Sequence, residues 1–283
     1  MYNTIKLLRF PFSLFLLPVS LFSLFYIHPA LNYQLVLVLG IWHLLVFPAS
    51  NGYNSYNDRD EGPIGGLASP PKPTLRLLHI TNALDVASIL LATLVSISFA
   101  GFVIVYIVAS RLYSNRSIRL KQFPIIGFLI VVVFQGAWVF CANILALGSV
   151  TLFLNPSVIF SAIASCFFIG TIYPITQIYQ HEADKQDGIT TLSMKLGKKA
   201  TFIFSGIMFM MATLFVYFSF SSDEMIGNFW LFNMLMLPAA FYFLTWSAKS
   251  FRSETHINFK NTMIMLVLSS VLNNIYFITI LLK

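Results

Sequence analysis

Long apolar segments, each close to the thickness of a lipid bilayer, restrict the fold of this chain more than any other feature. The hydrocarbon core of a bilayer is roughly 30 Å thick, and an α-helix needs about 20 apolar residues to cross it. Nine such segments follow one another along the chain: 10–28, 33–50, 79–97, 99–113, 124–148, 155–178, 200–220, 227–248 and 262–281. The sequence therefore predicts an all-α, multi-pass membrane protein of about nine transmembrane helices, with one domain over residues 1–283.

Composition supports this prediction and argues against a soluble fold. The chain is 58% hydrophobic and only 10% charged, whereas soluble domains carry about 25% charged residues. The first apolar segment follows Lys6 and Arg9, is long enough to span, and is followed by no small-residue cleavage site. We interpret it as the first helix and not as a removed signal peptide.

The third and fourth helices are predicted by dividing one apolar run. Residues 79–113 form a run of 35 residues, which as one helix would be about 52 Å long at 1.5 Å per residue. That length would need extreme tilt within a bilayer. We therefore expect two passes with a tight turn near Ala100–Gly101.

The distribution of Lys and Arg predicts the orientation. Basic residues concentrate in cytoplasmic loops of membrane proteins. With nine helices, the N-terminus and every second loop lie on one side, and that side holds 16 of the 17 basic residues, with only Lys283 left over. We expect the N-terminus and these loops to be cytoplasmic, in a cell (inner) membrane. The net charge of +7 is then a consequence of topology, so no nucleic-acid partner is expected.

Six of the ten acidic residues lie in two segments on this predicted cytoplasmic side: the first acidic segment, residues 51–63, and the second acidic segment, residues 179–188. Positions three or four apart share one face of a helix. The residues at this spacing are Asn54, Asp58 and Glu61 in the first segment and Gln180, Asp184 and Asp187 in the second. Hard oxygen ligands suit Mg²⁺, so Asp58, Glu61, Asp184 and Asp187 are predicted metal ligands.

Basic residues accompany the two acidic segments. Lys72 follows the first segment, Arg119 and Lys121 precede the fifth predicted helix, and Lys185 lies within the second segment. Two interpretations remain open for them. They mark the cytoplasmic side, or they bind the oxygens of a diphosphate, which Arg contacts in a bidentate manner.

Three motifs, taken together, resemble the UbiA superfamily of intramembrane prenyltransferases. The stretch Asn54-Ser-Tyr-Asn-Asp58 matches the Asn and the first Asp of that family's first motif. The stretch from Glu182 through Asp184 to Gly197 resembles its second motif, and Tyr113-Ser with Arg119-Leu-Lys121 resembles its segment between helices four and five. Two positions depart from the pattern, because Gly62 and Gln180 stand where the family has aspartates.

The resemblance implies transfer of a prenyl group from an allylic prenyl diphosphate to a small acceptor, often aromatic, in a Mg²⁺-dependent reaction. It implies a helix bundle around a central chamber, with Asp58 and Asp184 as catalytic residues. The substrate-binding residues would be Asn54, Lys72, Tyr113, Arg119, Lys121 and Lys185. Membrane lipid is expected around the bundle.

Two other functions fit parts of the pattern. The two replaced aspartates favour a non-catalytic descendant that binds prenyl lipids or a partner protein. The helix count alone favours a small transporter, but transporters place polar residues near the bilayer midplane in both halves. Here the polar cluster lies at one face.

Overall fold

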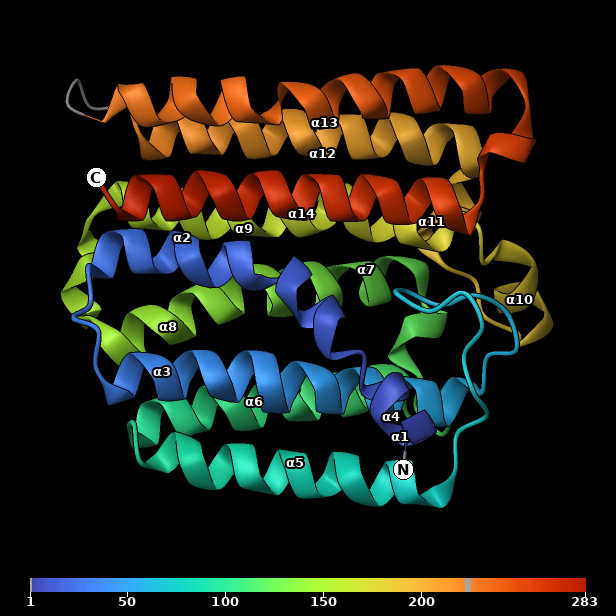
Figure 1. Cartoon of the computed structure of the whole chain (residues 1–283), viewed down its shortest axis with the longest axis horizontal. Coiled ribbons are helices and arrows are strands. Elements are labelled where there is room, and N and C mark those ends of the chain that lie inside the picture. Colours follow the sequence, from blue (N-terminus) through green and yellow to red (C-terminus); the bar gives the residue numbers. More distant parts are fainter. Residues whose placement is uncertain (1, 222–224) are drawn as a thin grey trace.

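The chain folds into a bundle of long helices that lie side by side, with their ends gathered at two opposite faces (Figure 1). The computed structural model describes residues 2–221 and 225–283, and that part of the chain contains helices and loops but no β-strand. Eight helices in it are long and apolar enough to cross a membrane, and a ninth is added if one bent helix pair counts as a span. The predicted all-α, multi-pass architecture is confirmed.

The N-terminal span is the bent one. It consists of α1 (Tyr2–Leu8), the 3₁₀ helix η1 (Phe10–Phe15) and α2 (Leu17–Ile27). The part formed by α1 and η1 is bent by 45° relative to α2. Arg9 adopts a left-handed conformation (φ 50°) between α1 and η1. The predicted first helix, residues 10–28, is interrupted, because residues 10–15 form a 3₁₀ helix and the chain bends at Leu16 before α2 begins.

The second span is longer than predicted. The helices α3 (Tyr33–Gly40), η2 (Ile41–Val46) and α4 (Phe47–Asp58) follow one another without a break. The middle piece is a π-helical turn that directly precedes Pro48, a residue with no N–H to donate. Because the helix continues to Asp58, Asn54 and Asp58 belong to its last turns, although they were expected just after it.

The division of residues 79–113 into two helices is confirmed, but the turn lies elsewhere. Helix α5 (Leu75–Thr93) ends before the predicted turn, and α6 (Ile97–Ser114) contains Ala100 and Gly101. The Ser96 side chain accepts a hydrogen bond from the N–H of Phe99 at 3.0 Å. This N-cap fixes the start of α6, because Ser satisfies N–H groups that a helix start leaves free.

The other spans begin and end within four residues of their predicted limits. They are α7, η4 and α8 as one unit (Pro124–Val133, Phe134–Trp138, Val139–Leu147), α9 (Pro156–Gln177), α12 (Lys198–Ser219), α13 (Ile226–Arg252) and α14 (Phe259–Leu281). Short helices connect them: η3 (Leu120–Gln122), η5 (Val150–Leu154), α10 (His181–Gln186), α11 (Leu192–Leu196) and η6 (Glu254–His256).

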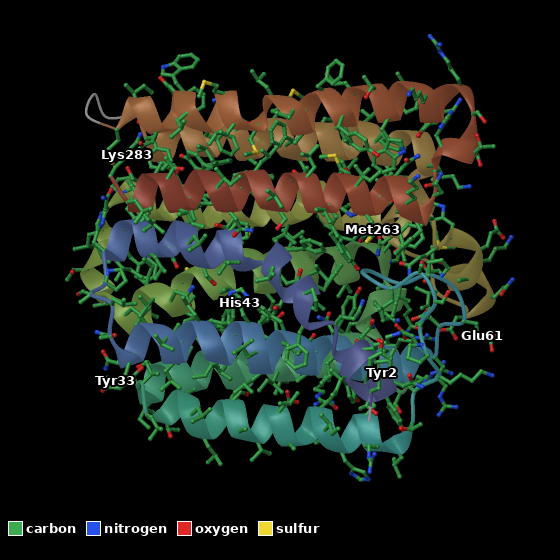
Figure 2. All side chains as sticks on the ribbon, in the orientation of Figure 1. Tyr2, Tyr33, His43, Glu61, Met263 and Lys283 are labelled. Carbon is green, nitrogen blue, oxygen red and sulfur yellow. The ribbon has the colours of Figure 1, made fainter. Side chains whose placement is uncertain are left out.

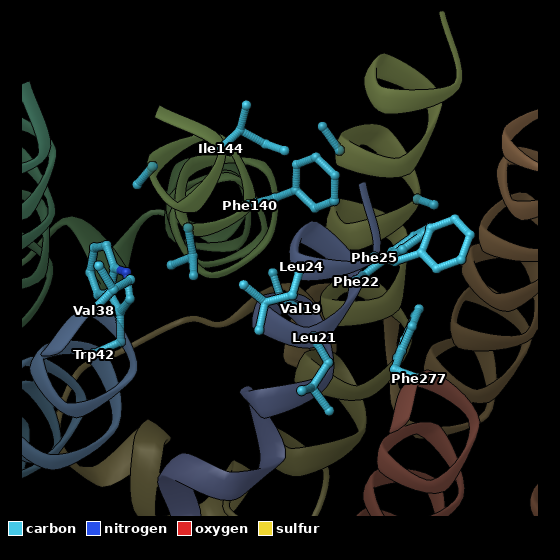
Figure 3. Close-up of a cluster of buried hydrophobic side chains, with 14 of the residues drawn as sticks. Val19, Leu21, Phe22, Leu24, Phe25, Val38, Trp42, Phe140, Ile144 and Phe277 are labelled. Atoms are coloured by element: carbon cyan, nitrogen blue, oxygen red, sulfur yellow. The ribbon is translucent and has the colours of Figure 1, made fainter. Parts of the chain in front are cut away.

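The largest cluster of buried side chains fills the end of the bundle away from α10 (Figures 1 and 3). Phe22 of α2 lies 4.7 Å from Phe277 of α14 and 5.7 Å from Phe140 of α8, measured between ring centroids. Beside these rings, Asn143 accepts a hydrogen bond from the Trp42 indole at 3.0 Å and donates one to Ser23 at 3.1 Å. The bundle is therefore solid at this end.

His43 lies near the middle of the bundle, between the end filled by this aromatic cluster and the half beside α10 (Figure 2). It is buried, with Nδ1 3.0 Å from the Ser13 carbonyl and Nε2 3.2 Å from the Ser20 hydroxyl. These contacts join the π-helical turn of the second span to the break in the first. The bend at η1 is thus held in place by the second span.

Candidate active site

A cavity of about 680 Å³ occupies the half of the bundle that the aromatic core leaves empty. Charged side chains line its end beside α10: Arg9, Asp58, Asp60, Lys121 and Asp184. Aromatic and aliphatic side chains line the rest. We call the end of the bundle that carries the two acidic segments the charged face.

Asp58 is the last residue of α4, and several basic and polar groups surround its carboxylate. The Asn54 amide donates hydrogen bonds to Asp58 Oδ2 at 2.8 Å and to the Ser114 hydroxyl at 3.2 Å. The Lys121 ammonium pairs with Asp58 Oδ1, and the Arg119 guanidinium lies 3.6 Å from the same oxygen. Asn54 thus orients the carboxylate from its own helix, while the basic residues arrive from the loop after α6.

Arg119 connects the two acidic segments. Besides its contact with Asp58, it pairs with the carboxylate of Asp187 and donates to the Asp187 backbone carbonyl at 3.1 Å. Arg116 supports the same junction, 3.5 Å from Asp187 Oδ1 and 2.6 Å from the Asn57 carbonyl. The third motif of the sequence resemblance therefore lies between the other two.

Asp60 and Asp184 face the cavity in an electrostatic field that disfavours their charge. Burial, together with the negative charges of Asp60, Asp58 and Asp187, raises the pKa of Asp184 to about 7 against the opposing effect of Lys121. Burial and the charge of Asp58 raise the pKa of Asp60 to about 6. A pKa raised by burial and like charges indicates a site that a bound cation would stabilise.

Glu61 and Lys72 are not brought to the cavity. Helix α4 ends at Asp58, and Arg59 turns the chain in a left-handed conformation (φ 55°). The helical alignment predicted for Glu61 with Asp58 is therefore absent. Glu61 lies at the outer edge of the molecule (Figure 2), 3.8 Å from Lys72, and the two side chains are 85% and 91% exposed.

The second acidic segment also departs from one continuous helix. A turn over residues 178–180 separates α9 from α10, and the amide of Gln180 donates to the Pro63 carbonyl at 3.1 Å. Gln180 thus ties the two segments together. Lys185 is exposed on α10 and does not line the cavity.

The structure places three residues in the site that the sequence motifs did not indicate. Asp60 lines the cavity in place of its neighbour Glu61. Arg9, counted only as a topology marker, donates to the Gly65 carbonyl at 3.2 Å and to Asn51 at 3.3 Å. Tyr173 of α9 shares a hydrogen bond with Tyr113 of α6, whose place in the site was predicted. The sequence around Arg9 does not indicate that this residue belongs to the site. It shows only that a proline, which interrupts helices, follows closely.

The two tyrosines lie near the charged end of the cavity, because Tyr113 is the second-last residue of α6 and Tyr173 is four residues from the end of α9. Both line the cavity, and the Tyr173 ring stacks on Phe128 with centroids 6.4 Å apart. Beyond them the lining is mostly apolar and rich in aromatic rings: Phe47, Tyr106, Phe134, Phe168 and Phe209. A ligand that fits this cavity has a polar or charged head and an apolar tail.

The acidic residues are not a preformed metal cage. Within residues 2–221 and 225–283, no group of three or more His, Cys, Asp or Glu side chains is placed to hold a metal ion. Mg²⁺, however, is usually bound by one or two carboxylates together with substrate phosphates. The oxygen donors of Asp58, Asp60 and Asp184 fit that kind of shared site, and their mutual repulsion favours a cation between them.

Polar atoms at the charged end are left without partners. Arg9 Nε, the Gln177 amide oxygen and the Tyr179 hydroxyl are buried and make no hydrogen bond, although all three residues line the cavity. Buried polar groups in folded proteins are nearly always hydrogen-bonded. These atoms are therefore positioned for a polar ligand.

Known proteins resemble this chain in sequence pattern and in fold. A model of the UbiA prenyltransferase family matches residues 15–270. No curated protein sequence matches the chain.

Several solved structures share the fold over nearly the whole chain. A UbiA homolog from Archaeoglobus fulgidus bound to DMAPP and Mg²⁺ superimposes with a TM-score of 0.68 at 18% identity, over 99% of each chain. The same homolog bound to GPP and Mg²⁺ gives a TM-score of 0.68 at 18% identity, over 99% of this chain and 100% of that one. A structure of a digeranylgeranylglyceryl phosphate synthase gives 0.62 at 16% identity, covering 99% and 97%.

Proposed function

This chain belongs to the UbiA prenyltransferase family, and we propose that it transfers a prenyl group from an allylic prenyl diphosphate to a small acceptor, typically aromatic, inside the membrane. One observation supports this most: both acidic segments and the basic loop after α6 meet at one end of an otherwise apolar cavity. An anionic head and an apolar chain match its two ends. Relatives of the same fold bind DMAPP or GPP with Mg²⁺.

In this proposal the diphosphate lies at the charged end, between the two acidic segments. Asp58, Asp60 and Asp184 supply oxygens for Mg²⁺, which when bound would offset the charge that grows on the departing diphosphate. Lys121 and Arg119, now paired with Asp58 and Asp187, contact diphosphate oxygens. Asp187 holds Arg119 in place, and Glu61, Lys72 and Lys185 take no part because they are exposed and pair with none of the three aspartates.

The bond that breaks joins the allylic carbon to the diphosphate oxygen, and its electron pair leaves with the diphosphate. The allylic cation then lies next to Tyr113 and Tyr173, at the border of the apolar part. Aromatic faces attract cations, and the apolar lining excludes water that would otherwise trap the cation. A ring carbon of the acceptor forms the new bond, and the proton it loses passes to an oxygen at the charged end.

The alternative from a different class is a non-catalytic descendant that binds prenyl lipids. Gly62 and Gln180 favour it, because Gln180 is occupied in holding the Pro63 carbonyl and offers no carboxylate. Asp60 favours catalysis, because it adds a cavity-facing carboxylate to the first segment.

Membranes containing the protein, labelled prenyl diphosphates and a panel of aromatic acceptors test the proposal, with Mg²⁺ or with EDTA. We expect product only with Mg²⁺, and a loss of at least 100-fold in Asp58→Asn and Asp184→Asn, since one preorganised electrostatic group contributes about 10²–10³ to a rate. Glu254→Gln is the matched control, because Glu254 is exposed and pairs with Lys198 at 2.8 Å, away from the cavity. No turnover with any donor and acceptor, or turnover unaffected by both aspartate changes, would contradict catalysis.

A further inference from the structure

An ion pair joins α5 to α6 outside the cavity. Nε of Arg111 donates a hydrogen bond to a carboxylate oxygen of Asp85 at 2.8 Å, and a terminal nitrogen of the same guanidinium pairs with that oxygen. The two side chains are 19% and 13% exposed, and neither belongs to the cavity lining. Asp85 lies ten residues beyond Leu75, the first residue of α5, which is about 15 Å along the helix. Charged residues at such a depth in a membrane-spanning helix are rare and are usually functional.

The ion pair reaches α4 through an aromatic ring. Cζ of the Arg111 guanidinium lies 3.8 Å from the centroid of the Tyr53 ring, within the range of cation–π attraction. Tyr53 is 8% exposed and directly precedes Asn54, the residue that orients Asp58. The guanidinium, held by Asp85, therefore covers one face of the Tyr53 ring and limits where its hydroxyl can point.

The Tyr53 hydroxyl fixes the residue that follows α6. It accepts a hydrogen bond from the Asn115 amide at 3.1 Å. The backbone carbonyl of Asn115 in turn accepts hydrogen bonds from the N–H of Arg119 at 2.7 Å and from the N–H of Ile118 at 3.1 Å. The side-chain oxygen of Asn115 accepts a third, from the N–H of Ser117 at 2.9 Å. Asn115 thus holds the first turn of the loop after α6, which we call the Asn115 turn (residues 115–119).

The Asn115 turn leads into the two cations that the proposed function places on the diphosphate. Arg119 adopts a left-handed conformation (φ 48°) and lies between Asp58 and Asp187. Lys121 follows two residues later and pairs with Asp58. A left-handed residue other than glycine persists only where the surrounding structure holds it. The hydrogen bond from the Arg119 N–H to Asn115 is such a contact.

We propose that Asp85 is a positioning residue for prenyl transfer, because it holds the loop that presents Arg119 and Lys121 to the diphosphate. It acts through Arg111 and Tyr53 and touches neither substrate nor metal. The inference rests on the proposed function, since the diphosphate is the group that the two cations would bind. Disturbing this path should raise the KM for the donor, because cations that hold the diphosphate contribute to binding before the bond breaks. A residue that only stabilises the fold would lower the amount of active protein and leave KM unchanged.

Tyr53→Phe tests the path with the smallest change, since it keeps the ring beneath Arg111 and removes only the hydroxyl. We expect the donor KM to rise about fivefold, the effect of one lost hydrogen bond, while kcat stays within about twofold. Tyr26→Phe is the matched control, because the Tyr26 hydroxyl also accepts a hydrogen bond, from Ser161 at 2.9 Å, but lies outside the cavity beside the aromatic core. An unchanged KM in Tyr53→Phe, or an equal rise in Tyr26→Phe, would overturn the proposal.

Asp85→Asn tests the origin of the path. We expect the donor KM to rise about tenfold, since a charge-assisted contact is lost. The double variant Asp85→Asn with Tyr53→Phe should match Asp85→Asn alone, because residues that act through one path have effects that do not add. Effects of the two changes that multiply would show that Asp85 acts independently of Tyr53 and would overturn the proposal. Tyr53→Phe alone decides the matter if Asp85→Asn does not fold.

Hydrogen exchange follows the loop without any turnover. Peptides that cover residues 115–122 should exchange faster in Tyr53→Phe and Asp85→Asn than in the unchanged protein, and at the same rate in Tyr26→Phe. Faster exchange spread over the whole chain would show a purely structural role and would contradict the inference. Absence of Mg²⁺-dependent turnover in the unchanged protein overturns the proposed function, while the exchange rates still decide whether Asp85 holds the loop.

Discussion

Asp60 and Glu61 are neighbours in sequence but face opposite environments. Asp60 lines the cavity, whereas Glu61 is 85% exposed beside Lys72. The left-handed residue Arg59 ends α4 and turns the following residues out of helical register. The backbone conformation of Arg59 therefore determines that Asp60, and not Glu61, is the second carboxylate that the first acidic segment brings to the cavity.

Asp60→Asn should lower Mg²⁺-dependent prenyl transfer at least tenfold, while Glu61→Gln should change it less than twofold. The reason is that only Asp60 can share a cation with Asp58 and Asp184. Initial rates at several Mg²⁺ concentrations measure the effect, and for Asp60→Asn we expect the Mg²⁺ requirement to rise. The reverse order of the two variants would show that Glu61 moves to the site when substrate binds.

Asp184 should make the metal-free protein less stable as the pH rises. Its pKa in the folded state is raised from 3.8 to about 7, so the folded state holds a proton that the unfolded state releases. The stabilising effect of that proton is complete below pH 4 and is lost as the pH rises through 7. At about 1.4 kcal/mol for each pKa unit, the upper bound is about 4 kcal/mol.

Asp184→Asn removes this titration without removing the polar side chain. In EDTA, the melting temperature of the variant relative to the unchanged protein should therefore increase between pH 5 and pH 8. Melting curves in detergent at several pH values measure the difference. A difference that is independent of pH would mean that Asp184 ionises normally in the folded protein.

At the scale of helices, the positions of the cavity walls depend on how closely two helix backbones approach each other. Gly136 lies in the π-helical turn η4, where an added Cβ would come within 2.7 Å of the Cα and backbone nitrogen of Cys166 on α9. Backbone atoms cannot move aside as side chains can. The fit between η4 and α9, and with it the position of Phe134 and Phe168 in the cavity, requires glycine at this position.

Gly136→Ala should destabilise the protein by about 1–3 kcal/mol, the usual cost of overpacking a close contact. Gly101→Ala is the comparison, because Gly101 has nothing within 4 Å of an added Cβ and alanine favours a helix by up to about 1 kcal/mol over glycine. The two variants should therefore shift the melting temperature in detergent in opposite directions. A melting temperature of Gly136→Ala equal to that of the unchanged protein would show that η4 and α9 can separate freely.

At the scale of the whole molecule, α1 and Lys283 lie toward opposite ends of the bundle (Figures 1 and 2). Helix α1 lies toward the end that carries α10, and Lys283 lies at the other end. The concentration of Lys and Arg on the charged face predicts that this face is cytoplasmic.

Fusions to green fluorescent protein, which fluoresces only when it folds in the cytoplasm, measure this orientation. A fusion after Lys283 should not fluoresce, and a fusion after Arg252, at the end of α13, should fluoresce strongly. Alkaline phosphatase fused at the same two positions should give the opposite pattern of activity. Strong fluorescence at both positions would contradict an odd number of spans.

Much of the fold follows from the sequence because it depends on local quantities. Bilayer thickness and the rise of a helix fix how many residues each span needs, so the apolar runs predict most spans to within four residues. The second span is an exception, because its last turns up to Asp58 are polar. The turn after α5 was misplaced because the Ser96 cap is a stronger signal than the small residues Ala100 and Gly101. The bend between Phe15 and Leu17 has no comparable signal, because the residues on both sides of it are hydrophobic.

The sequence by itself determined the class of protein, the number of spans and the gathering of acidic and basic residues on one face, since hydrophobic length and charge placement need no tertiary contact. Only the tertiary structure decided which of those residues line the cavity. Asp60 replaces Glu61 because Arg59 turns the backbone at the end of α4, and Arg9 enters because the first span breaks and is held by Asn51 and Gly65. The two acidic segments meet through Arg119 and Gln180, whose partners are distant in sequence, and helical spacing within one segment carries no information about such contacts.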